Sequence, residues 1–188
     1  MEAIDVANAD DPVTVDVDGN ALPREVFHAQ RMTHWLGVVA PHADAAQRLA
    51  ARAHHLRRWT LPRSDYPTGR AGYLRWRAAQ KQRHVTALGE VLRRVGVDDN
   101  TIDRVGTIVA KVGLGQDPAV QAHEDALCLV FLEQQYDELT DQLGDDHMID
   151  VLRRTLAKMS PVGLEAAVGM NLSERGRALL VAARSTES

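Results

Sequence analysis

The chain has 188 residues, of which 45% are hydrophobic, 26% charged and only 4% aromatic, and its formal net charge is −4. This length suits one globular domain, and a core built mainly from Ala, Leu and Val favours packed helices over a β-sandwich. The acidic balance gives no reason to expect nucleic-acid binding through overall charge, and a single cysteine, Cys128, excludes a disulfide framework.

Residues 1–22 begin with a short helical pattern and continue as the alternating stretch from Val13 to Asn20. Because no second strand is evident, this alternation predicts an extended N-terminal arm, and residues 23–188 are expected to form a single helical domain. No apolar run approaches the roughly 18 residues that span a bilayer, and the acidic N-terminus is unlike a signal peptide. With a buried, reduced Cys128, these features predict a cytoplasmic protein.

Apolar periodicity predicts helices over residues 23–40, 44–59, 71–95, 98–112, 118–143, 146–158, 161–169 and 173–184. Asp44 is a suitable helix cap, and Pro23 and Pro118 suit first turns. The segment LPRSDYPTGRAG, residues 61–72, contains two prolines and two glycines and predicts a long ordered loop, a kind of segment that is often functional. The predicted fold class is all-α, a single-domain, bundle-like array of helices.

Histidines on inward helix faces are candidate metal ligands. His28 shares a stripe with Met32, and His84 lies one turn before Leu88. The adjacent pair His54 and His55 lies in the predicted helix 44–59, where neighbouring side chains point about 100° apart. We therefore expect His55 to face an ion and His54 to face either the opposite side of the cleft or a partner behind the ligands.

Asp125 begins the most apolar run of the chain, four residues before Leu129, and Glu124 lies beside it. A buried carboxylate must be paired, protonated or bound to a cation. Neutral imidazoles that converge with such a carboxylate suit Mn, Fe, Ni, Co or Zn, whose bound water would be the nucleophile. The alternative is a set of unrelated core and surface histidines.

A basic cluster follows the histidine pair, with Asp65 as the only acidic residue between Arg57 and Glu90. Guanidinium groups bind phosphate or carboxylate in a bidentate manner, so this cluster predicts an anion site. The alternative is a set of solvated helix faces. Nucleic acid is not expected, because aromatic side chains do not recur at regular spacing. The phosphate-binding candidates are Arg57, Arg58, Arg63, Arg70, Lys81 and Lys111.

The order of the candidate ligands resembles that of the HD-domain superfamily of helical, metal-dependent phosphohydrolases. Residues 28–32 (HAQRM) resemble its opening motif H-x-x-R-V, residues 49–55 its His-Asp doublet helix, and residues 124–126 (EDA) its closing aspartate. His55 replaces the doublet aspartate, and Lys111 stands where a second late histidine is expected. These departures argue against a two-metal centre and leave open a mononuclear site or a fold without metal.

Three longer segments, RAHHLRRWTLPRSDYPTGRAGYLRWR, QAHEDALCLVFLEQQYDEL and LRRTLAKMSPVG, resemble the DUF4202 family. This resemblance extends from the region of residues 10–12 to the last helix. It implies no established activity, so any chemistry is inferred from the residues above and from the resemblance to HD domains.

These features together predict an HD-like, metal-dependent phosphohydrolase acting on a small phosphorylated or nucleotide substrate. The metal ligands would be His28, His54, His55, His84 and Asp125, and the catalytic carboxylates Glu124 and Asp125. One alternative is a non-catalytic binding module that holds an anionic ligand in the same Arg-rich loop and helix pocket. Another is a helical interaction protein in which the histidines are incidental. The expected partner is a small anionic molecule, with no membrane or nucleic acid, and the sequence leaves a homo-oligomer open.

Overall fold

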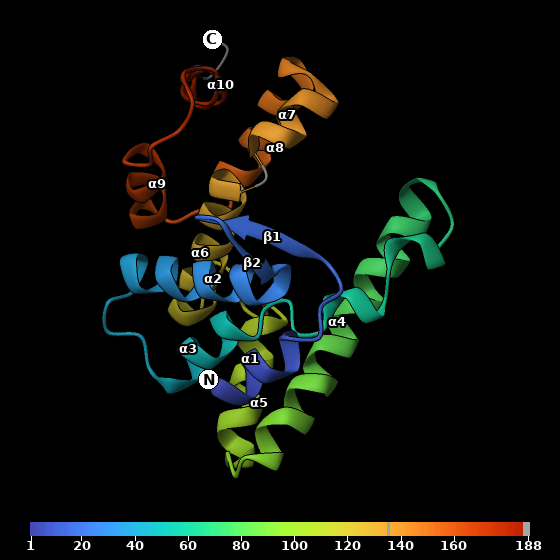
Figure 1. Cartoon of the computed structure of the whole chain (residues 1–188). Coiled ribbons are helices and arrows are strands. Elements are labelled where there is room, and N and C mark those ends of the chain that lie inside the picture. Colours follow the sequence, from blue (N-terminus) through green and yellow to red (C-terminus); the bar gives the residue numbers. More distant parts are fainter. Residues whose placement is uncertain (135, 186–188) are drawn as a thin grey trace.

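A computed structural model describes residues 1–134 and 136–185 and is predominantly helical, which confirms the all-α prediction (Figure 1). Strands β1 (Thr14–Val17) and β2 (Asn20–Pro23) form its antiparallel hairpin. No helix in the described ranges combines the length and the apolar character needed to cross a membrane. The helices are α1 (Glu2–Asn8), α2 (Arg24–Val39), α3 (Ala45–Arg52), α4 (Gly69–Arg94), α5 (Asp99–Val109), α6 (Pro118–Gln134), α7 (Tyr136–Leu143), α8 (Asp145–Leu156), α9 (Pro161–Val168) and α10 (Glu174–Arg184), with 3-10 turns η1 (Arg58–Thr60) and η2 (Arg63–Asp65).

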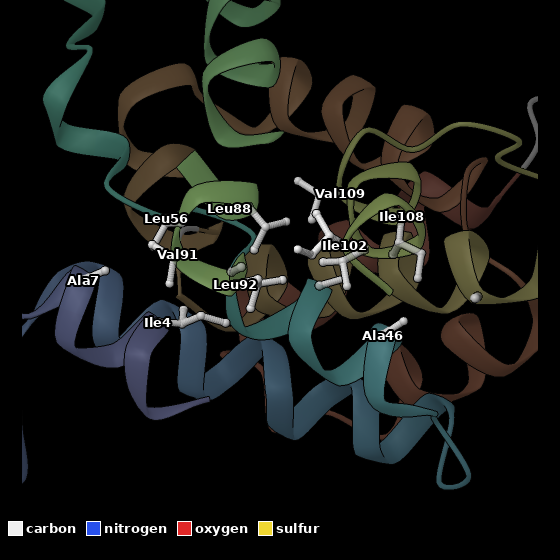
Figure 2. Packing of buried hydrophobic residues seen from close by; sticks show 14 of the residues in the cluster. Ile4, Ala7, Ala46, Leu56, Leu88, Val91, Leu92, Ile102, Ile108 and Val109 are labelled. Carbon is white, nitrogen blue, oxygen red and sulfur yellow. The ribbon is translucent and has the colours of Figure 1, made fainter. Parts of the chain in front are cut away.

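Helix α6 is the central element, because it contributes to three apolar clusters. Its first turn packs with α1, α3, α4 and α5, the cluster shown in Figure 2. Its middle packs against Met32 and Leu36 of α2, and Leu129 joins Met148 and Leu152 of α8. The predicted helix 118–143 corresponds to α6 and α7, which flank residue 135, outside the described residues.

The prediction of an unpaired extended arm is wrong for residues 14–23, because residues 20–23 supply the second strand. The turn between the strands places Asp18 and Gly19 at φ of 52° and 80°, as a two-residue hairpin turn requires. Asp11 accepts hydrogen bonds from the backbone N–H groups of Val13 and Glu25, each at 3.0 Å, and so joins the hairpin to the start of α2. Before the hairpin, α1 buries Ile4 completely in the core.

Helix α3 ends at Arg52, so the predicted helix over residues 44–59 is too long. Its start agrees with the prediction, since Asp44 forms a capping box with Gln47. Beyond Arg52 the chain turns irregularly, and side chains of α4 hydrogen-bond to its backbone. Trp76, Gln80 and Arg83, on one face of α4, donate to backbone carbonyls within residues 56–61. These tertiary hydrogen bonds give partners to carbonyls of a segment that has no regular secondary structure to satisfy them.

Helix α9 docks on α6 through Asp125. Ser160, the N-cap of α9, donates its backbone N–H to Asp125 Oδ1 at 2.8 Å and its hydroxyl to Oδ2, and Gln121 donates to Oδ1 at 3.0 Å. Gly163 lies against this carboxylate, because a Cβ added there would approach Asp125 Cγ to 2.7 Å. The close approach of α9 therefore requires the absence of a side chain at Gly163.

We expect Gly163→Ala to destabilise the protein by about 1–3 kcal/mol, because the methyl group must displace a hydrogen-bonded, buried carboxylate. Gly37→Ala is the matched control: Gly37 is also helical, but its Cβ would meet nothing within 4 Å. Gly37→Ala should raise stability by about 0.5–1 kcal/mol, through helix propensity alone. Urea unfolding measures both effects, and equal effects of the two changes would contradict this account of α9 packing.

Candidate metal centre

Histidines from several elements converge beside α6. His28 comes from α2, His54 and His55 from the turn after α3, His84 from α4 and His123 from α6. The rings of His28 and His55 stack with centroids 4.0 Å apart, and those of His54 and His55 are 4.7 Å apart. His123 lies 4.8 Å from His54, and His84 lies 6.2 Å from His55. We call these five residues the histidine cluster.

His28, His54 and His55 form a group that can hold a metal ion, since ligand nitrogens from the three rings lie within 4.8 Å of one another. The expectation that only His55 of the pair would face an ion assumed helical backbone at both positions. Because α3 has already ended at Arg52, the 100° offset does not apply. Both members of the pair therefore point into the histidine cluster.

Burial keeps the histidine cluster uncharged at neutral pH. Burial is the largest influence on His28, His84 and His123 and lowers the pKa of each to about 3, with nearby cations acting in the same direction. Burial likewise lowers the pKa of His54 and His55, and neighbouring histidines reinforce the effect. Neutral imidazole is the form that binds metals, so the cluster needs no deprotonation before an ion can bind.

Three ring nitrogens of the cluster are buried and have no hydrogen-bond partner among the described residues: Nε2 of His28, Nε2 of His84 and Nδ1 of His123. Nδ1 of His54 and Nε2 of His123 satisfy one another at 2.8 Å. Buried polar atoms almost always have a partner, so the three orphaned nitrogens mark positions that a bound ligand or water would satisfy.

Glu25 and Arg58 hold the ring of His55 from opposite sides. Arg58 Nη1 lies 3.1 Å from Nε2 of His55, and Glu25 Oε2 lies 3.2 Å from Nδ1. Because a guanidinium only donates, Nε2 accepts, so Nδ1 carries the ring proton and donates to Glu25. Burial raises the pKa of Glu25 to about 7, and the positive charges of Arg24 and Arg58 partly oppose that rise.

The carboxylates predicted to be catalytic lie apart from the group of His28, His54 and His55. Glu124 forms an ion pair with Lys111, which follows α5, and Asp125 points toward Ser160. Successive residues of a helix point about 100° apart, so His123, Glu124 and Asp125 contact three different elements. Both oxygens of Asp125 accept hydrogen bonds within the fold, which makes a structural role its principal role.

The predicted anion-binding residues are dispersed, and only Arg58 and Lys111 lie beside the histidine cluster. Arg63 donates to the carbonyls of Tyr66, Pro67 and Gly69, and so closes its own loop. Arg57 adopts a left-handed conformation, with φ of 50°, and is held by Ala7 and Asn8 of α1. Arg70 and Lys81 are exposed on α4.

Sequence reasoning assigned no role to Glu25 or His123, although signals for both were present. Glu25 precedes His28 by three residues, so the two share a face of α2. His123 begins the polar triplet of residues 123–125 in an otherwise apolar helix. Its partner His54 lies far away in the chain, and the contact between them follows only from the fold.

The buried histidines make the stability of the metal-free protein depend on pH. Unfolded histidine titrates near pH 6.5, whereas His28, His84 and His123 have pKa values of about 3 in the fold. The unfolded chain therefore binds more protons between these values, and stability falls as the pH falls below about 6.5, by up to about 1.4 kcal/mol per pH unit for each histidine. Glu25 has the opposite effect, because its pKa is raised in the fold. Its contribution to stability is present at acid pH and is lost as the pH rises through about 7.

We expect the histidines to outweigh Glu25, so the urea midpoint of the metal-free protein should drop between pH 7.5 and 5.5. His84→Gln should reduce this drop, because the slope of the free energy of unfolding against pH loses the contribution of roughly one proton. His34→Gln, at an exposed position on α2, should leave it unchanged. A midpoint that does not vary with pH would contradict the neutral state of the cluster.

The family model of DUF4202, a domain of unknown function, matches residues 1–180 of the chain. No curated protein and no solved structure matches it. The match covers the histidine cluster, all of α6 and the docking of α9. The chain therefore belongs to the DUF4202 family.

Proposed function

We propose that this protein is a cytoplasmic, metal-dependent phosphohydrolase that acts on a small phosphorylated molecule. The observation that supports it most is the convergence of His28, His54 and His55, with ligand nitrogens within 4.8 Å in a buried, uncharged cluster. A buried cluster of neutral imidazoles with three orphaned nitrogens gains little as hydrophobic core, whereas a divalent ion held by His28, His54 and His55 would give the ring of His28 a partner.

The donor set favours an ion that prefers nitrogen. His28, His54 and His55 contribute imidazoles, and no carboxylate belongs to that group. Of the ions that a histidine site can hold, this set favours Zn, Co or Ni over the oxygen-preferring Mn. When bound, such an ion lowers the pKa of a water molecule and polarises a phosphoryl oxygen.

The residues around the histidine cluster have separate tasks under this proposal. Glu25 fixes the tautomer and orientation of His55, as carboxylates do for many metal-binding histidines. Arg58 places positive charge at one edge of the cluster, where it can attract a phosphate, whereas the charge of Lys111 is balanced by Glu124. Only His55 of the cluster has appreciable side-chain exposure, 15%, so a substrate would approach from its side.

One observation favours a second candidate, a binding module without turnover. Glu124 is engaged by Lys111 and Asp125 by Ser160, so neither of the carboxylates predicted from the sequence is free to act as a general base. In such a module the same metal centre and cations would hold an anion without cleaving it.

Metal content tests the centre. We expect the purified protein to contain close to one equivalent of a divalent transition metal, and His28→Ala and His54→Ala each to lose most of it. His34→Ala is the matched control, because His34 lies on the same helix as His28 but is exposed. Asp125→Asn should retain the metal while unfolding at lower urea concentration. Elemental analysis of the four variants decides, and a parent protein that binds no metal even after reconstitution would refute the proposal.

Turnover tests the hydrolase. We expect the metal-loaded protein to release phosphate from members of a panel of phosphate monoesters, and His54→Ala to lower the rate by at least about a hundredfold, because the activated water is lost. Arg63→Ala is a useful comparison, since Arg63 closes its own loop and should have little effect on turnover. Binding of the same esters without phosphate release would support the binding module instead.

A further inference from the structure

A connected set of charged and aromatic side chains surrounds the more exposed edge of the histidine cluster. Arg58 contacts His55 and lies over the ring of Trp76, 4.9 Å from its centroid. The ring of Tyr73 lies beside that of Trp76, with centroids 6.0 Å apart, and the guanidinium carbon of Arg77 lies 5.8 Å from the ring centroid of Tyr73. These residues extend outward from His55 along the first half of α4, the part that projects beyond the rest of the molecule in Figure 1.

A third arginine borders the same edge from α2. Arg24 lies 3.7 Å from Glu25, the carboxylate that holds His55, and its side chain is 46% exposed. Burial is the largest influence that lowers the pKa of Arg58, and the positive charges of Arg24 and Arg77 lower it further. The three guanidinium groups are therefore close enough to interact electrostatically. The edge therefore has cations from α2, from η1 and from α4.

The charges of this edge are not balanced locally. Glu25 faces Arg24 and Arg58, and the carboxylate of Asp11 lies near Glu25, so the three arginines outnumber the nearby carboxylates even when both are ionised. Among the described residues, the ion pairs include Arg24 but neither Arg58 nor Arg77. The two positive charges of Arg58 and Arg77 match the charge of one dianionic phosphate monoester.

The aromatic part of the edge also faces solvent. Tyr73 is 43% exposed, which is unusual for a large ring that could be buried elsewhere. Trp76 is anchored below it, because its indole N–H donates to the carbonyl of Leu61 at 3.0 Å. An exposed ring that lies beside an anchored indole and beside arginines is an arrangement on which nucleobases stack.

We propose that Arg24, Arg58 and Arg77, together with Tyr73, form a binding site for a nucleoside monophosphate. The phosphate lies between the three guanidinium groups, next to His55, and the base packs on Tyr73. Turnover of this ligand rests on the proposed hydrolase function, but its binding does not, because none of the four residues belongs to the metal-binding group.

Isothermal titration of the metal-free protein with a nucleoside 5′-monophosphate, ribose 5-phosphate and inorganic phosphate tests the site. The mononucleotide should bind most tightly. Arg77→Ala should weaken its binding about tenfold, through the loss of one charge-assisted contact. Tyr73→Leu should weaken mononucleotide binding about fivefold and leave phosphate binding unchanged. Arg75→Ala is the matched control, since Arg75 is an exposed arginine of the same helix that points about 160° away from Arg77.

Equal affinity for the mononucleotide and for inorganic phosphate would overturn the role of Tyr73, and equal effects of Arg75→Ala and Arg77→Ala would overturn the site. Tighter binding of a ten-nucleotide single strand, lost in Arg70→Ala and Lys81→Ala, would replace the proposal with a nucleic-acid surface along α4. If the parent protein contains metal but binds no mononucleotide, this inference fails and the metal centre stands. If it binds the mononucleotide but no metal, the hydrolase fails and this site stands.

Discussion

The burial of α6 constrains most of the structure. None of its residues from 119 to 132 is exposed, yet it contains three consecutive polar residues, His123, Glu124 and Asp125, of which none is more than 3% exposed. Each needs a partner, since an unpaired buried polar or charged group costs several kcal/mol. Because the three point in different directions, the partners come from the turn after α3, the end of α5 and the start of α9. Three segments far apart in the sequence are thereby fixed around one helix.

The histidine cluster follows from that constraint. His123 needs a partner inside the fold, and His54 provides it only because the chain leaves helical geometry after Arg52. The irregular backbone is in turn supported by α4, whose Gln80 donates to the carbonyls of Arg58 and Leu61. The same departure from the helix brings His55 beside His28. A cluster that can hold a metal is thus assembled by the hydrogen-bonding requirements of its neighbours.

Local signals predicted the helices well and their tertiary connections poorly. The helix cap at Asp44 could be predicted from the sequence, because its partner Gln47 lies only three residues away. The end of α3 could not, because it depends on side chains of α4 more than twenty residues further along the chain. The sequence indicated that a buried Asp125 must be paired, protonated or bound to a cation, but only the fold brings Ser160 to it. The second strand was missed because residues 20–23 contain little alternation of their own and pair through the turn at Gly19.

Arg58 links the two proposals. Its guanidinium now occupies the lone pair of His55 Nε2, and a lone pair has one partner at a time. If an ion is bound by that nitrogen, Arg58 must leave it, and an anion held with Arg24 and Arg77 would then offer it an opposing charge in addition to Glu25. An anion that draws Arg58 away from His55 should raise the affinity of the protein for the metal. Because linkage is reciprocal, the metal should raise the affinity for the anion by the same factor. Such coupling would let a phosphate ligand and its metal ion bind together, while each alone competes with a hydrogen bond of the resting fold.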